Sequence, residues 1–115
     1  MRLTEEQMQD KLLEKIQRDY TDYLDSLLDS DREMLKNSVQ ELSVKADMLL
    51  EFEHFNPLEG DNLKAILKKR HPLNYLYKQW DKQSGSLDEN IHWAIIEIAE
   101  QEAERLALHK SDPER

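Results

Sequence analysis

Two Glu-x-x-His motifs, Glu51–His54 and Glu89–His92, come closest to the spacing of a catalytic metal site. Residues three apart lie on one face of a helix, so each motif could supply two ligands to a metal ion. Di-iron and di-manganese bundles add a glutamate from each of two further helices, and Glu14 and Glu41 are the candidates for that role. The motifs therefore suggest a di-metal carboxylate bundle as one hypothesis.

Chance is the competing explanation, because the chain has fourteen glutamates and four histidines. Both histidines of the motifs also fall near predicted helix ends, whereas di-metal sites lie in the middle of a bundle. Other enzyme classes lack their motifs: there is no cysteine, no serine in a Gly-x-Ser-x-Gly turn, and only two glycines for a phosphate-binding loop. We therefore expect a protein that is not an enzyme, with no cofactor and no metal, and keep the di-metal bundle as an alternative.

Two rows of carboxylates are the main candidates for contact with a partner. In the first row the spacings are three, three and four residues: Asp19, Asp22, Asp25 and Asp29. In the second row the spacings are three and four residues: Glu97, Glu100 and Glu104. Carboxylates about 5–6 Å apart along a helix can imitate a row of phosphates and contact a basic protein. The competing interpretation is a face that only keeps the protein soluble. We predict that these seven residues bind a partner.

The segment 57–82 is a basic island in an acidic chain of net charge −9. It holds three acids and six basic residues, which are Lys64, Lys68, Lys69, Arg70, Lys78 and Lys82. Tyr75, Tyr77 and Trp80 lie between them, so a nucleic-acid-binding regulator that uses the 64–82 island is a second alternative. The overall negative charge disfavours direct contact with nucleic acid or with an anionic membrane. A solvated lysine face, with Tyr77 and Trp80 in the core, is the competing interpretation.

The elements that would position these side chains are helices. Gly and Pro total five in 115 residues, too few for the turns of an all-β fold. We predict an all-α, compact bundle of about five helices, with residues 1–110 as a single domain and 111–115 as a frayed tail. The longest apolar run is four residues, from Trp93 to Ile96, so we expect no transmembrane span and no signal peptide. Trp93 itself is expected in the core or an interface. With no cysteine, these features suggest a cytoplasmic protein.

Capping signals give the expected helix boundaries. Thr4–Gln7 is a capping box for a long first helix that ends near Asp29, and Ser30–Glu33 is another for a long second helix, with a bend at Ser43–Val44. Two short helices then flank the proline elbow at His71–Pro72, one from residue 58 or 59 to 70 and one from 72 to 82. A third capping box, Ser86–Glu89, opens a long C-terminal helix that runs to about residue 109.

Several segments in this order resemble a known group of proteins. They are Leu49-Leu50-Glu51, Lys64-Ala65-Ile66-Leu67-Lys68, His71-Pro72-Leu73 with Tyr77 four residues on, and the helix from Asp88 to Glu97. Over residues 20–104 the chain resembles a bacterial family of small domains of unknown function that are often encoded on integrative and mobile elements. It departs from that family at Tyr75, where an acid is usual. The resemblance implies a helical cytosolic domain in a mobile-element setting and transfers no functional residue.

Together these observations predict a small acidic protein-interaction module. The resemblance implies a mobile-element protein, and such elements often carry inhibitors of host defence. The expected partner is therefore a basic, nucleic-acid-handling host protein, alone or in complex with nucleic acid, which this chain inhibits or modulates. Self-association into a homo-oligomer is the remaining possibility for a partner.

Overall fold

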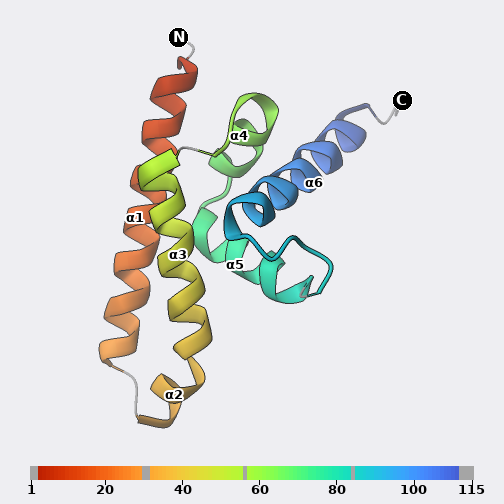
Figure 1. Ribbon diagram of the computed structural model, residues 1–115. Helices are drawn as coiled ribbons and strands as arrows, with labels where there is room; N and C mark the ends of the chain where they lie inside the picture. Colours follow the sequence, from red (N-terminus) through yellow and green to blue (C-terminus); the bar gives the residue numbers. More distant parts are fainter. Residues whose placement is uncertain (1–2, 30–31, 56, 84, 112–115) are drawn as a thin grey trace.

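The computed structural model describes residues 3–29, 32–55, 57–83 and 85–111 (Figure 1). These residues form helices and no strand, which confirms the predicted all-α bundle. The helices are α1 (Glu5–Leu28), α2 (Arg32–Asn37), α3 (Val39–Phe55), α4 (Gly60–Leu67), α5 (Pro72–Lys82) and α6 (Ile91–Ser111). Within the described ranges, no helix combines the length and apolar character needed to cross a lipid bilayer.

Helix α1 begins as its sequence predicts. The Thr4 hydroxyl accepts a hydrogen bond from the Gln7 N–H at 3.0 Å, and the Gln7 side chain accepts one from the Thr4 N–H at 2.9 Å. Two amides that have no partner inside the helix are thereby satisfied. From this start, Leu12 and Ile16 recur four apart and are buried in the core.

The predicted second long helix is divided at Ser38, which separates α2 from α3. The Ser38 N–H bonds to the Leu35 carbonyl at 3.1 Å in a tight turn, and the Ser38 carbonyl then accepts the Leu42 N–H at 2.9 Å as α3 begins. The same carbonyl accepts a hydrogen bond from the Tyr23 hydroxyl of α1 at 3.4 Å. The interruption thus lies at Ser38, and α3 continues without a break through Ser43–Val44, where a bend is predicted. The predicted capping box begins at residues 30 and 31, which lie outside the described ranges.

Helix α4 is shorter than predicted and ends at Leu67 rather than Arg70. Its first residue, Gly60, has a φ of +55°, a conformation that other residues rarely adopt. The Gly60 N–H bonds to the Glu5 carboxylate of α1 at 3.2 Å. At the other end, the Lys15 ammonium of α1 donates to the Leu67 carbonyl at 2.6 Å and to the Lys69 carbonyl at 3.2 Å. Carbonyls left free at a helix C-terminus attract a cation, so Lys15 favours this early end.

Pro72 lies in the first turn of α5, as predicted, but the predicted start of the last helix is wrong. Helix α6 begins at Ile91, and the capping side chain is Asn90 rather than Ser86. The Asn90 side-chain oxygen accepts the His92 N–H at 2.9 Å, and its carbonyl accepts the Ala94 N–H at 2.9 Å. Asparagine caps helices at least as well as serine, so the later residue defines the start. Of the predicted tail, Ser111 closes α6 and residues 112–115 are not described.

The helices are arranged in two groups around one core (Figure 1). Helices α1 and α3 lie side by side and antiparallel, α5 packs against both, and α4 packs against both α1 and α6. The molecule measures 51 × 31 × 27 Å, because the α1–α3 pair extends beyond the core to the tip that holds α2. The largest fully buried hydrophobic side chains are Leu12, Ile16, Met48, Leu58, Leu63, Ile66, Leu73, Leu76, Ile95 and Ile98.

Candidate functional site

Asp19 is buried, although the sequence places it in a row of surface carboxylates. Its side chain is 4% exposed and accepts a hydrogen bond from the Leu73 N–H at 3.0 Å. Its other oxygen lies 3.2 Å from Nδ1 of His71. The carboxylate thus satisfies an amide in the first turn of α5, a position that favours negative charge. Asp19 therefore connects α1 to the elbow. Unlike the other three aspartates of the row, its carboxylate is not exposed for contact with a partner.

Asp22 and Asp25 are exposed on the last turns of α1, and Asp29 is exposed as its C-cap. A step of three residues falls about 60° short of a full helical turn, so the row rotates away from the buried face after Asp19. Large apolar side chains are exposed in the same part of the molecule: Leu24, Leu28, Leu35 and Val39. We call these exposed residues, at the end of α1 and on α2 and the start of α3, the distal tip. Leu28, 83% exposed, is the most prominent of them.

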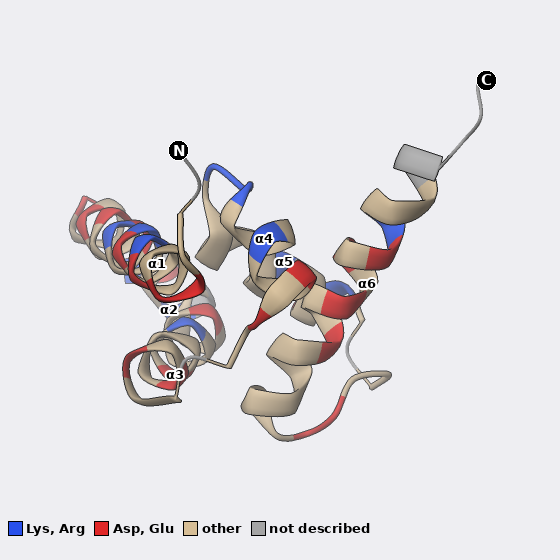
Figure 2. Cartoon of the chain, turned by 90° about the horizontal axis from the view of Figure 1, so that it is seen from above, with Lys and Arg blue, Asp and Glu red and all other residues tan. Residues whose placement is uncertain are grey.

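The second predicted row, on α6, also divides. Glu97 is half-buried and accepts the Asp88 N–H at 2.9 Å, so it holds the loop before α6. Glu100 and Glu104 are exposed. Figure 2 shows α1 and α6 on opposite sides of the molecule, each with its own acidic residues. The two rows are therefore separate surfaces and cannot form one continuous acidic face.

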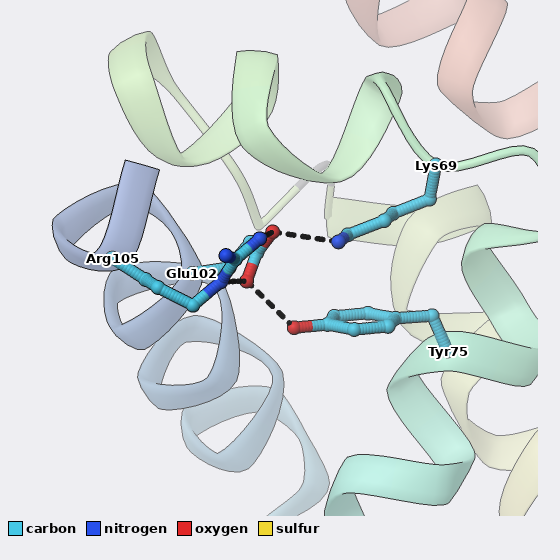
Figure 3. A network of polar contacts seen from close by, with 4 residues as sticks. All are labelled: Lys69, Tyr75, Glu102 and Arg105. Atoms are coloured by element: carbon cyan, nitrogen blue, oxygen red, sulfur yellow. Dashed lines mark hydrogen bonds and ion pairs between the residues drawn. The ribbon is translucent and has the colours of Figure 1, made fainter. Parts of the chain in front are cut away.

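The inner side of α6 carries a buried carboxylate, Glu102, that was not singled out from the sequence (Figure 3). Glu102 is 3% exposed. It accepts hydrogen bonds from Arg105 at 2.7 and 2.8 Å, from the Lys69 ammonium at 2.6 Å and from the Tyr75 hydroxyl at 3.0 Å. The i, i+3 spacing to Arg105 is visible in the sequence, but the burial and the contacts from the α4–α5 elbow and from α5 are not.

The contacts of Glu102 strongly favour its ionised form. The hydrogen bonds from Arg105 are the largest cause that lowers the pKa of Glu102 to about 2; burial opposes the shift, and Lys69 and Tyr75 add to it. Burial, followed by donation to this carboxylate, raises the pKa of the Tyr75 hydroxyl to about 12. Lys69 also lies over the Tyr75 ring, 4.2 Å from its centre. Around neutral pH the Glu102 carboxylate therefore stays ionised and the Tyr75 hydroxyl stays neutral. Fixed charge states suit a structural network better than proton transfer.

The basic island does not form one surface, because its residues divide among three roles. Lys69 contacts Glu102 inside the chain, whereas Arg70, Lys78 and Lys82 are exposed. Lys64 and Lys68 border a shallow groove of about 440 Å³ between α4 and α6, lined also by Asp61, Ala65, Ala103, Leu106 and Ala107. Tyr77 and Trp80 are half-buried and stack on each other with ring centres 5.9 Å apart. The island therefore lacks the exposed aromatic rings that would stack on bases.

The two Glu-x-x-His motifs do not form the predicted pair of chelating sites. One residue from each motif is in contact: a carboxylate oxygen of Glu51 lies 2.8 Å from Nδ1 of His92. The other two, His54 and Glu89, are exposed. Of the suggested extra ligands, Glu41 pairs with Lys45 at 2.6 Å and Glu14 is exposed. No group of three or more His, Cys, Asp or Glu side chains in the described ranges is placed to hold a metal ion. The geometry thus gives the di-metal alternative no support.

No protein-family model, no curated protein and no solved structure matches this chain. The resemblance to the mobile-element family therefore remains a prediction from the sequence, and the function has to be inferred from the surfaces themselves.

Proposed function

We propose that this chain is a small protein-interaction module without catalytic activity, which binds a basic surface of another protein through its distal tip. The observation that carries the proposal is the combination, on one end of the molecule, of three exposed aspartates with exposed leucines. Asp22, Asp25, Leu24 and Leu28 are exposed on the last two turns of α1, and Asp29 is exposed at its C-cap. Contacts between proteins combine an apolar centre with a polar rim, and this surface offers both.

The charge of the chain favours a basic partner. At −9 it attracts cationic surfaces and repels phosphates, and the aspartate row could occupy a groove that normally binds a nucleic-acid backbone. The partner proposed is therefore a nucleic-acid-handling protein, alone or with its nucleic acid, which the chain inhibits or modulates. In line with the mobile-element resemblance, we place this action in the bacterial cytoplasm. The exposed Glu100 and Glu104 of α6 would form a second, separate contact.

The buried polar groups support a role in binding rather than catalysis. Asp19 and Glu102 each satisfy several donors within the chain. In the described part of the chain, every buried side-chain nitrogen or oxygen has a hydrogen-bond partner. The nucleic-acid alternative has less support, because Lys69 contacts Glu102 and the aromatic rings at 77 and 80 are half-buried.

The test compares two variants of equal charge change in a capture experiment from a bacterial lysate. The tip variant carries Asp22→Lys, Asp25→Lys and Asp29→Lys. The control carries Glu6→Lys, Asp10→Lys and Glu14→Lys, three exposed acids on the first half of the same helix. We expect the wild type and the control to retain the same basic partner, identified by mass spectrometry, and the tip variant to lose it. Equal retention by the tip variant would overturn the proposal.

A further inference from the structure

Two exposed aromatic rings lie where the end of α3 meets the start of α6. Phe55 is 64% exposed and Trp93 is 54% exposed, high values for side chains of this size. His92 lies between them: its ring centre is 6.0 Å from that of Phe55 and 5.0 Å from that of Trp93. Both contacts are edge-on, at 83° and 89°. We call Phe55, His92 and Trp93 the aromatic face.

His92, at the centre of the aromatic face, is held in place before any partner arrives. Nδ1 of His92 is 2.8 Å from a carboxylate oxygen of Glu51, which fixes the ring from the side of α3. The His92 N–H donates to the side chain of Asn90 at 2.9 Å, which fixes the backbone at the first turn of α6. Binding of a partner would therefore cost little conformational freedom at His92, the residue that joins the two exposed rings.

The electrostatic surroundings of the aromatic face are negative. The two segments that supply it, residues 46–63 and 83–104, contain no Lys or Arg. Of their eleven Asp or Glu, eight are exposed, and the other three, Glu51, Glu97 and Glu102, bond to groups within the chain. Glu53, Asp88 and Glu89 are exposed and lie within four residues of Phe55 or His92 in the sequence. Such surroundings attract a cation and repel nucleic acid, and they also disfavour pairing of this face with the same face of a second copy.

We propose that the aromatic face binds an arginine-bearing segment of the basic partner, with a guanidinium group stacked on the exposed ring of Trp93 or Phe55. Arginine fits better than lysine because its planar group stacks on aromatic rings and is less strongly hydrated. The carboxylates around the rings then attract the other positive charges of the arginine-bearing segment. This inference rests on the proposed function only for the basic nature of the partner, since the surface is distinct from the distal tip.

The probe is a blocked hexa-arginine peptide, and a blocked hexa-lysine peptide is its control for general charge attraction. In a Trp80→Phe background Trp93 is the only tryptophan, so its fluorescence reports on the aromatic face. We expect hexa-arginine to change the Trp93 emission and to bind several-fold more tightly than hexa-lysine. Loss of one exposed cation–π contact in Phe55→Ala should raise the dissociation constant for hexa-arginine by about three- to fivefold.

Calorimetry extends the test to variants without Trp93. Trp93→Ala together with Phe55→Ala should weaken binding of hexa-arginine by about tenfold, toward the affinity for hexa-lysine. Trp80→Phe should bind as the wild type does, because Trp80 stacks on Tyr77 away from this face. Far-ultraviolet circular dichroism checks that each variant keeps its helices.

Two results would overturn the inference. One is equal binding of the two peptides with no effect of the Phe55 and Trp93 changes, which would leave only general charge attraction. The other is a wild-type dimer that Trp93→Ala converts to a monomer, which would assign the face to a second copy of this chain. The two claims can fail separately. If the tip variant loses the lysate partner but the peptides do not distinguish the rings, the proposed function stands and the inference fails. If hexa-arginine binds at the rings but the lysate yields no basic partner, the inference stands and the proposed function fails.

Discussion

The carboxylate of Asp19 in α1 accepts a hydrogen bond from the backbone N–H of Leu73, in the first turn of α5, at 3.0 Å. One helical turn earlier, the Lys15 ammonium binds the carbonyls of Leu67 and Lys69 where α4 ends. Helix α1 therefore places a cation at the negative end of α4 and an anion at the positive end of α5. This pair fixes the elbow at His71–Pro72, and with it the angle between the two short helices.

Replacing Asp19 should therefore affect stability. Asp19→Ala leaves the Leu73 N–H without its acceptor, so the free energy of unfolding should fall by about 2 kcal/mol. Urea unfolding followed by circular dichroism measures this change. The control is Asp22→Ala, an exposed residue of the same row, which should change stability by less than about 0.5 kcal/mol. Equal stability of the two variants would show that the Asp19 contact does not hold the elbow.

Lys15 should show a smaller effect of the same kind. In Lys15→Met the apolar stem remains but the bonds to the Leu67 and Lys69 carbonyls are lost, so stability should fall by about 1 kcal/mol. Lys11→Met, at an exposed position one turn earlier, is the matched control and should be nearly neutral. Because Lys15 and Asp19 hold the same elbow, we expect their effects to be non-additive in the double variant.

The Glu102 network should make stability depend on pH in acid. The pKa of Glu102 is lowered from an ordinary value of 4.5 to about 2, so the folded chain holds the ionised form. Its contribution is complete above pH 4.5 and is lost as the pH falls through 2. Glu102→Gln should lower the free energy of unfolding by about 1–3 kcal/mol at pH 7, since Lys69 and Arg105 are exposed enough to be rehydrated.

Urea unfolding of both chains from pH 7 to 2 measures the Glu102 effect. The difference between them should stay constant down to about pH 5 and shrink below it. Glu104→Gln, which changes an exposed neighbour on the same helix, is the matched control and should change stability at pH 7 by less than about 0.5 kcal/mol. A difference for Glu102→Gln that did not change with pH would contradict the assigned pKa.

Tyr75 should report the same network in alkali. The folded chain holds the neutral hydroxyl, with a pKa raised from 10.0 to about 12, so this contribution is present below pH 10 and is lost as the pH rises through 12. Tyr75→Phe removes the bond to Glu102 but keeps the ring under Lys69, and should cost about 1 kcal/mol at pH 7.

Absorbance of tyrosinate during an alkaline titration gives a direct measurement for Tyr75. The difference between the wild type and Tyr75→Phe should appear near pH 12 while the chain remains folded, and near pH 10 in urea. Appearance of the difference at pH 10 in the folded chain would show that neither burial nor donation to the Glu102 carboxylate holds the Tyr75 hydroxyl neutral.

The features that depend on neighbouring residues could be predicted from the sequence. The capping box at Thr4, the start of α5 at Pro72 and the apolar spacing of Leu12 and Ile16 are all local, and all are found. The helix boundaries that were predicted wrongly are those where another helix contacts the chain, or where a second residue competes with the predicted one to cap the helix. Ser38 ends α2 next to the Tyr23 hydroxyl, and Asn90 replaces Ser86 as the cap of α6.

What the sequence by itself determined is the helical, acidic character of the chain and the residues that could carry charge on its surface. Only the tertiary structure decided which of those charges remain on the surface. Asp19 is buried because α5 begins against its side of α1, whereas Asp22 and Asp25 lie on turns that rotate away from that contact. Glu102 is buried and Glu104 exposed for the same reason: helical spacing sets the direction of a side chain, and the packing partner sets its surroundings.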